Sequence, residues 1–380
     1  MATLLTDAQV IERVFAHIDA GTTDESDTLW REPTANYSDP ARLTAELELM
    51  RRVPTVFCPS AALPDKGSYV ARTAAGTPLV AVRGEDGVVR AFRNACRHRG
   101  VQVAQPSLTG DACAKVFTCP YHAWTYRLDG RLEYIPHDKG FPQVDKTEFG
   151  LVEVNAEEQH GLIFITQEKP IGRGALDGLA KIPQLLTSDQ VLFNSTDKVL
   201  ETNWKLNAEA TLEGYHIKPT HPETFYPYGY DNLTLVELFG ANSRVTFPFR
   251  RIEKLRAVPA EERCIDGMVT YTYQLFPNVT VAVLSNHTSI AIAEPITQMR
   301  TRFVTYMLTN RGTGAGTANL EKARKDASFV AEQGLKEDQA MVDSIQRGLA
   351  SGANEYFTYG KFETGIAHFH KTLTDGLAKL

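Results

Sequence analysis

The sequence lacks the features that define several large classes of protein. Met1 to Ala20 contains Asp7, Glu12 and Arg13 in place of an uninterrupted apolar core, so we expect no signal peptide. The net charge of −6 argues against nucleic acid or an anionic membrane surface as a main partner. No glycine-rich dinucleotide fingerprint follows a predicted strand, so we expect that the chain cannot take electrons from NAD(P)H unaided.

Cysteine and long apolar segments are also scarce. The chain has only 5 cysteines, and without an export signal we expect metal ligation rather than disulfides, in a cytoplasmic protein. Leu275 to Ala293 contains no Asp, Glu, Lys or Arg, but Pro277, Asn278 and His287 interrupt it. We therefore interpret this stretch as short strands and expect no membrane contact.

Two short cysteine–histidine pairs, Cys96-x-His98 and Cys119-x-x-His122, lie in the first third of the chain. Two thiolates and two imidazoles can hold a [2Fe–2S] cluster of the Rieske type, with sulfur ligands on one iron and nitrogen ligands on the other. Trp124 would help to shield such a cluster from water. A structural zinc site is the alternative, but zinc sites more often pair cysteine with cysteine and histidine with histidine.

The pattern along the 380 residues predicts three regions. Residues 1–52 contain two helices, which we expect to pack on residues 167–380. Residues 53–166 show strand-like runs between glycine-containing turns, which predicts a small all-β domain around both Cys/His pairs. Residues 167–380 mix helices with strands, including four strand-like runs between Val269 and Leu308 and a long helix from about Asn319 to Leu349.

A second metal site is predicted in the third region. We expect a helix over roughly Asn203 to Ile217, on which Glu209, Glu213 and His216 share one face. His221 would reach back from the turn that follows. Two imidazoles and one carboxylate on one side of an iron(II) leave positions open, which is the facial triad of non-heme iron oxygenases.

Asp338 is the candidate for the carboxylate ligand. It shares a helical stripe with Val342, Ile345 and Leu349, which are all apolar. A carboxylate on a buried face needs a cation or a metal ion. The alternatives are a different helical register or a salt bridge to a buried arginine.

The two motifs, in this order, resemble those of the Rieske non-heme iron oxygenases, the aromatic ring-hydroxylating oxygenase α-subunit family. The resemblance extends from about Val53 to His370. It implies an α+β protein with a small all-β Rieske [2Fe–2S] domain. It also implies a catalytic α+β domain, in which helices cover a helix-grip-like antiparallel sheet and hold a mononuclear iron(II). Dioxygen would be the co-substrate.

The resemblance also implies roles for single residues and for partners. Glu213 takes the place of the family's acidic residue that bridges the two metal centres, linking His216 to His122 of a neighbouring subunit in a homotrimer. A solvent-facing charge is the alternative for Glu213. Glu209 either lines the iron pocket or is a surface charge. Electrons would come from a separate reductase, with or without a ferredoxin.

We expect a terminal oxygenase component that hydroxylates a small apolar or aromatic substrate, with N- or O-dealkylation as a further outcome. Tyr271–Phe276, Val279–Leu284 and Ser289–Ala293 would line the substrate pocket, or else simply pack in the core. An aromatic-ring cis-dihydroxylating dioxygenase is the alternative reaction. A Rieske electron carrier without catalysis is the alternative from another class, and it predicts no second metal.

Overall fold

The computed structural model describes residues 4–27, 29–109, 112–167, 183–312 and 316–380. The chain forms two compact units. One contains Met50–Ser188, and the other combines Met1–Leu49 with Asp189–Leu380. We refer to them as the cluster unit and the catalytic unit. The predicted boundaries at 52/53 and 166/167 stay predictions, because contacts inside compact units do not fix where a functional domain ends.

The cluster unit is built from two antiparallel sheets, and the predicted all-β character is confirmed. The larger sheet has the strand order β2-β10-β9-β5-β4-β3, and the smaller has β6-β7-β8. The strands are β2 (Thr55–Pro59), β3 (Tyr69–Ala74), β4 (Thr77–Arg83), β5 (Val89–Arg93), β6 (Val116–Thr118), β7 (Thr125–Arg127), β8 (Leu132–Tyr134), β9 (Glu153–Gln159) and β10 (Leu162–Thr166). A core that includes Phe117, Trp124 and Tyr126 packs beneath the loops that carry the Cys/His pairs.

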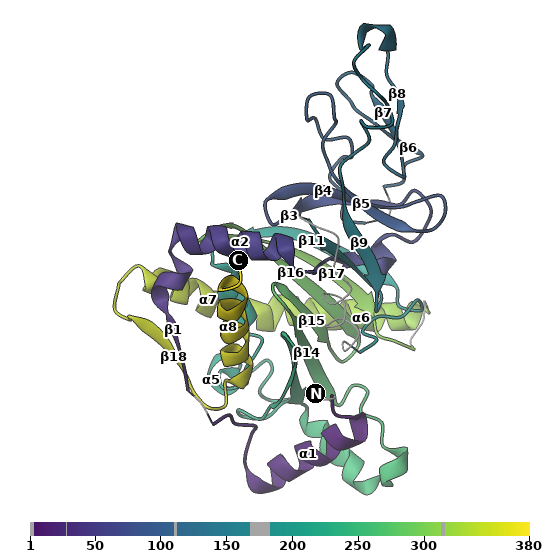
Figure 1. The fold of residues 1–380 in the computed structure, drawn as a ribbon. Helices are drawn as coiled ribbons and strands as arrows, with labels where there is room; N and C mark the ends of the chain where they lie inside the picture. Colours follow the sequence, from purple (N-terminus) through teal and green to yellow (C-terminus); the bar gives the residue numbers. More distant parts are fainter. Residues whose placement is uncertain (1–3, 28, 110–111, 168–182, 313–315) are drawn as a thin grey trace. The chain divides into compact units, whose positions relative to one another are not determined.

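The catalytic unit contains a seven-stranded antiparallel sheet in the order β11-β17-β16-β15-β14-β13-β12 (Figure 1). The strands are β11 (Leu192–Leu200), β12 (Leu235–Phe239), β13 (Asn242–Pro248), β14 (Val269–Leu275), β15 (Val279–Val283), β16 (His287–Thr297) and β17 (Arg300–Thr309). The four strands predicted between Val269 and Leu308 are therefore present. A separate pair, β1 (Trp30–Pro33) and β18 (Tyr356–Tyr359), joins the two ends of the chain.

Among the described residues, the α-helices are α1 (Asp7–Ala20), α2 (Pro40–Arg52), α4 (Trp204–Glu209), α5 (Ile217–Thr220), α6 (Thr317–Phe329), α7 (Leu335–Leu349) and α8 (Thr364–Leu377). Helices α1, α4, α6 and α8 contact the seven-stranded sheet. Helix α8 packs on β12 and β13, where Gly365 lies against Val245. Helix α1 begins at a capping box made by Thr6 and Gln9. Within the described ranges, none of the helices combines the length and apolar character needed to traverse a bilayer.

The predicted helix over Asn203 to Ile217 is wrong. Helix α4 ends at Glu209, and α5 does not begin until Ile217. The reason is local, because the Glu213 carboxylate accepts the backbone N–H groups of Tyr215 and His216. Such bonds offer the backbone an alternative to the helical ladder. Glu209, Glu213 and His216 therefore do not share one helical face.

The predicted long helix is confirmed, with one local difference. Between α6 and α7 the chain widens into a π-helical turn over Val330–Gly334. The stripe that includes Asp338 is only partly buried, because Val342 is buried while Ile345 is 41% exposed. Burial of this stripe therefore does not by itself require a metal ion at Asp338.

Candidate functional site

Both Cys/His pairs of the cluster unit lie on tight loops. Cys96 and His98 follow β5, and the Cys96 N–H bonds to the Val101 carbonyl at 2.8 Å. Cys119 and His122 occupy the connection between β6 and β7, where the Cys119 N–H bonds to the Trp124 carbonyl at 2.8 Å. These backbone bonds hold each Cys/His pair as a unit.

The four predicted ligands lie in one region, where the two cysteines are buried and the two histidines are half-buried. The His98 and His122 ring centroids are 4.7 Å apart, and the His98 ring stacks on Trp124 at 5.0 Å with an interplanar angle of 7°. Cys96 and Cys119 are both buried. Burial raises the pKa of Cys96, and the neighbouring Cys119 thiol also raises it, although the Tyr126 hydroxyl opposes them. Two thiols crowded together in this way favour a metal that takes them as thiolates.

An orphaned nitrogen supports a [2Fe–2S] cluster in this place. His122 Nδ1 is buried and has no hydrogen-bond partner among the residues that the structure describes. Among the described residues, only one set of three His, Cys, Asp or Glu side chains brings its ligand atoms within 4.8 Å of one another, and it lies in the other unit. Ligands that do not converge on one point suit two irons better than a single tetrahedral zinc.

That convergent set is His216, His221 and Asp338. The histidines flank the short helix α5, and Asp338 lies in the first turn of α7. His221 Nε2 lies 2.8 Å from Asp338 Oδ1, and His216 Nε2 lies 3.5 Å from the same oxygen. The structure therefore brings together all three residues predicted to bind iron, although the helix expected to present them is broken.

Carboxylates hold the second nitrogen of each histidine. His216 Nδ1 bonds to Glu213, the residue for which the family resemblance implies this contact, and His221 Nδ1 bonds to Glu337 Oε2 at 2.7 Å. Burial alone would lower the pKa of both histidines, but Glu213 and Asp338 raise that of His216. For His221, the charges of Asp338 and Glu337 likewise outweigh burial and raise the pKa. Sequence reasoning missed Glu337, and its only signal was its position next to Asp338.

The donor set fits a divalent iron. Glu213, Glu337 and Asp338 surround two imidazoles, so the carboxylates outnumber any positive charge that the histidines supply, and a bound cation would balance them. Each imidazole keeps one nitrogen for a metal because the other is bonded to a carboxylate. Two nitrogens and one carboxylate oxygen on one side match the facial arrangement of iron(II) oxygenases.

Glu209 is neither a surface charge nor a neighbour of this iron site among its described contacts. It is buried and accepts hydrogen bonds from the hydroxyls of Tyr37 (2.7 Å) and Tyr359 (3.0 Å). His370 Nε2 lies 2.9 Å from Glu209, and its Nδ1 lies 3.4 Å from Glu32. This buried polar network connects α4 and α8 with the β1–β18 pair.

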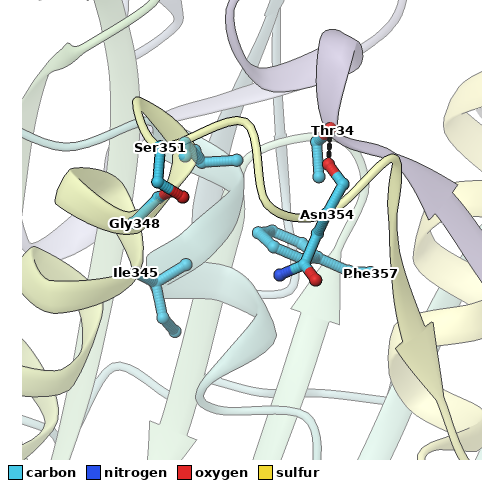
Figure 2. Close-up of a pocket in the computed structure, with 7 residues that line it drawn as sticks. Thr34, Ile345, Gly348, Ser351, Asn354 and Phe357 are labelled. Atoms are coloured by element: carbon cyan, nitrogen blue, oxygen red, sulfur yellow. Dashed lines mark hydrogen bonds between the residues drawn. The ribbon is translucent and has the colours of Figure 1, made fainter.

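A cavity of about 200 Å³ lies at the carboxyl end of α7 (Figure 2). Its lining includes Ile345 and Gly348 of α7, Phe357 of β18, and Asn354, whose backbone oxygen accepts a hydrogen bond from Thr34. No charged side chain and none of the strands expected to line the substrate pocket contribute to it.

Comparison with known proteins identifies the two halves of the chain. Residues 53–146 match the Rieske [2Fe–2S] domain, and residues 187–379 match the catalytic domain of the ring-hydroxylating alpha subunit. The carnitine monooxygenase oxygenase subunit of Escherichia coli K12 is 28% identical over 90% of this chain and 93% of its own. The glycine betaine monooxygenase oxygenase subunit of Chromohalobacter salexigens is 34% identical over 50% of this chain and 43% of its own.

The fold is also that of a solved quaternary ammonium Rieske monooxygenase in complex with L-carnitine. The two chains share 21% identity with a TM-score of 0.75, and the match covers 99% of each. The two domain matches imply a Rieske cluster and a mononuclear iron, with dioxygen as co-substrate. The family relies on a separate reductase or ferredoxin for its electrons. The chain therefore belongs to the ring-hydroxylating alpha-subunit family of Rieske oxygenases, the terminal oxygenases of multicomponent systems.

Proposed function

We propose that the catalytic unit is a monooxygenase centre in which His216, His221 and Asp338 hold iron(II). The observation that carries this proposal is the convergence of both histidine Nε2 atoms on Asp338 Oδ1. Iron(II) bound by such a triad activates dioxygen for attack on a substrate carbon. We further propose that Cys96, His98, Cys119 and His122 hold the cluster, with Trp124 excluding water from it.

Glu213 is proposed to connect the two centres. Its carboxylate fixes His216 from the Nδ1 side and is itself held by the Tyr215 and His216 N–H groups. In a homotrimer it would also meet His122 of the partner subunit, so that one carboxylate orients both imidazoles. Glu213→Gln keeps an acceptor but loses the charge. We expect this variant to retain both metals and to lose coupling between cluster oxidation and product formation, so normal turnover would remove the bridging role.

The substrate space is proposed to lie over one face of the central sheet. On β15 and β16, the half-buried Thr280, Ala282, Ser289 and Ala291 pair directly across the strands. They share the face that carries Val245, on which α8 packs. Small side chains in the middle of a sheet leave room beneath the helices, whereas Tyr273, Val281 and Ile290 on the other face are buried and pack in the core.

A quaternary ammonium compound is the proposed substrate class, with N-dealkylation as the reaction. Two similar proteins are named for carnitine and glycine betaine, which carry such a group. With neutral histidines, the three carboxylates exceed the two positive charges of iron(II) by one, and this remaining negative charge favours a cationic substrate in a partly enclosed site. This proposal replaces the small apolar or aromatic substrate expected from the sequence with a charged one.

A substrate screen with a surrogate reductase tests the function. Oxygen uptake and product mass are measured with quaternary ammonium compounds and with aromatic hydrocarbons. Loss of an alkyl group with release of an aldehyde is the expected result. Hydroxylation of the carbon bonded to nitrogen gives an unstable hydroxylated carbon, whose bond to nitrogen then breaks. A gain of two oxygens on an aromatic ring would instead establish the dioxygenase alternative, and the absence of oxygen uptake with every compound would contradict an oxygenase.

A further inference from the structure

His221 is the most tightly enclosed of the convergent residues. Its side chain is completely buried, whereas those of His216 and Asp338 are 22% and 20% exposed. Its Nδ1 bonds to Glu337 Oε2 at 2.7 Å, and its ring lies 4.7 Å from that of Phe225. The ring is therefore constrained both at its edge and on its face.

Glu337 is itself held in place from the loop that follows His221. Thr224 donates its hydroxyl hydrogen to Glu337 Oε2 at 2.6 Å, so one carboxylate oxygen receives both the threonine and the imidazole. An ionised carboxylate only accepts hydrogen bonds, so Nδ1 of His221 carries the hydrogen. The Nε2 atom, which lies 2.8 Å from Asp338 Oδ1, is then the nitrogen left for a metal.

The π-helical turn that precedes α7 supports this arrangement. A π-helical turn adds a residue and so rotates everything after it, which sets the direction of Glu337 and Asp338. Gly334 closes this turn, and a Cβ at that position would lie 1.8 Å from the Phe225 ring. The missing side chain thus makes room for the ring that packs on His221.

We propose that Glu337, oriented by Thr224, is a positioning residue that fixes the ring orientation and the Nδ1 hydrogen of His221, and thereby sets the metal affinity of the His216–His221–Asp338 site. The inference rests on the proposed function, because it assumes that this site binds iron(II). It adds a second carboxylate–histidine pair to the pair formed by Glu213 and His216. Removing a carboxylate of this kind typically weakens metal binding by about 10–100-fold.

Anaerobic titration of ferrous iron into protein depleted of its mononuclear iron, with the cluster retained, tests the proposal. Nitric oxide serves as the EPR reporter of the bound iron. We expect Glu337→Ala to weaken iron binding by roughly 10–100-fold and to broaden the EPR signal, as ring orientation is lost. Glu337→Gln, which keeps an acceptor oxygen, should lose less, and Thr224→Val should show a smaller loss of the same kind.

Glu321→Gln is the matched control, because Glu321 is exposed on α6 and lies outside the π-helical turn. It should bind iron like the unaltered protein. Unchanged affinity and EPR signal in Glu337→Ala would overturn the inference. If that variant fails to fold, unchanged binding in both Glu337→Gln and Thr224→Val overturns it instead. Failure of the unaltered protein to bind about one ferrous iron beyond the cluster would refute the proposed function itself.

Discussion

The two candidate metal sites are built in opposite ways. The cluster site takes its predicted ligands from two short loops of one β-rich unit, and backbone hydrogen bonds within each loop hold the Cys/His pairs. The iron site takes His216 and His221 from one segment and Asp338 from a helix far along the chain. Side-chain contacts, from Glu213 and Glu337, hold its histidines.

This difference suits the two tasks. An electron carrier works best when its ligands do not move, and short loops tied by backbone bonds provide that rigidity. A centre that admits substrate needs open coordination positions, so its ligands stand on separate elements around a space. As a consequence, long-range packing must position those elements. We expect a variant that disturbs one metal site to leave the other metal site unchanged.

Removing one iron ligand should give the largest effect, and it should leave the cluster site unchanged. We expect His216→Ala to abolish turnover, because two remaining ligands cannot hold iron(II) in the facial arrangement. The visible spectrum of the cluster should remain, and iron content should fall from about three to about two atoms per chain, since the cluster holds two. Activity assays, absorption spectra and iron analysis on one preparation check this.

Cys96→Ser is the corresponding variant at the cluster site. It should remove the visible spectrum and leave the catalytic unit able to bind about one ferrous iron. Loss of the cluster spectrum in His216→Ala would show that the two sites have been assigned to the wrong residues. A preparation with two irons per chain before any substitution would favour the electron-carrier alternative.

The same contrast explains what the sequence could and could not predict. The cluster residues follow from spacing alone, because each Cys/His pair is local. The three residues predicted to bind iron do converge, yet the helix expected to present His216 was wrong, because the Glu213 carboxylate accepts backbone N–H groups and so breaks the helical ladder after Glu209. Glu337 was missed because its partner His221 lies far away in the sequence, and only tertiary packing brings the two together.

Substitution of Glu32 tests whether the buried polar network that includes this residue stabilises the catalytic unit. Burial opposes the ionisation of Glu32, but the neighbouring His370, together with hydrogen bonds from Asn36 and Trp30, outweighs it and lowers the pKa of Glu32 to about 2. A depressed carboxyl pKa stabilises the fold above pH 4.5, and this contribution disappears as the pH falls toward 2. Glu32→Gln should therefore cost about 3 kcal/mol at pH 7 and less at pH 3.

Denaturant unfolding of the catalytic unit at both pH values measures this difference. Glu25→Gln is the control, because Glu25 is exposed near the same strand. It should change the free energy of unfolding by less than about 0.5 kcal/mol at either pH. A Glu32→Gln loss that stayed constant between pH 7 and pH 3 would mean that the Glu32 charge is not what stabilises the network.

The variant with the smallest expected effect changes the reduction potential of the cluster without removing the cluster. The Tyr126 hydroxyl lies 3.2 Å from Cys96 Sγ and accepts the Arg97 N–H at 2.9 Å, so its hydrogen is free to point at a cluster-bound sulfur. Such a bond stabilises the more negative reduced cluster. A net hydrogen bond is worth about 1 kcal/mol, which is roughly 40 mV for one electron. Tyr126→Phe should lower the reduction potential by about that amount.

Potentiometric titration of the cluster spectrum checks the shift, with Tyr134→Phe as the control because Tyr134 is 55% exposed. The iron site should bind ferrous iron as before, since its ligands lie in the other unit. Turnover should slow only to the extent that electron supply limits it. A rise in potential would mean that the hydroxyl does not donate to Cys96, and the cluster would then owe its tuning to burial and to the stacked His98 and Trp124 rings instead.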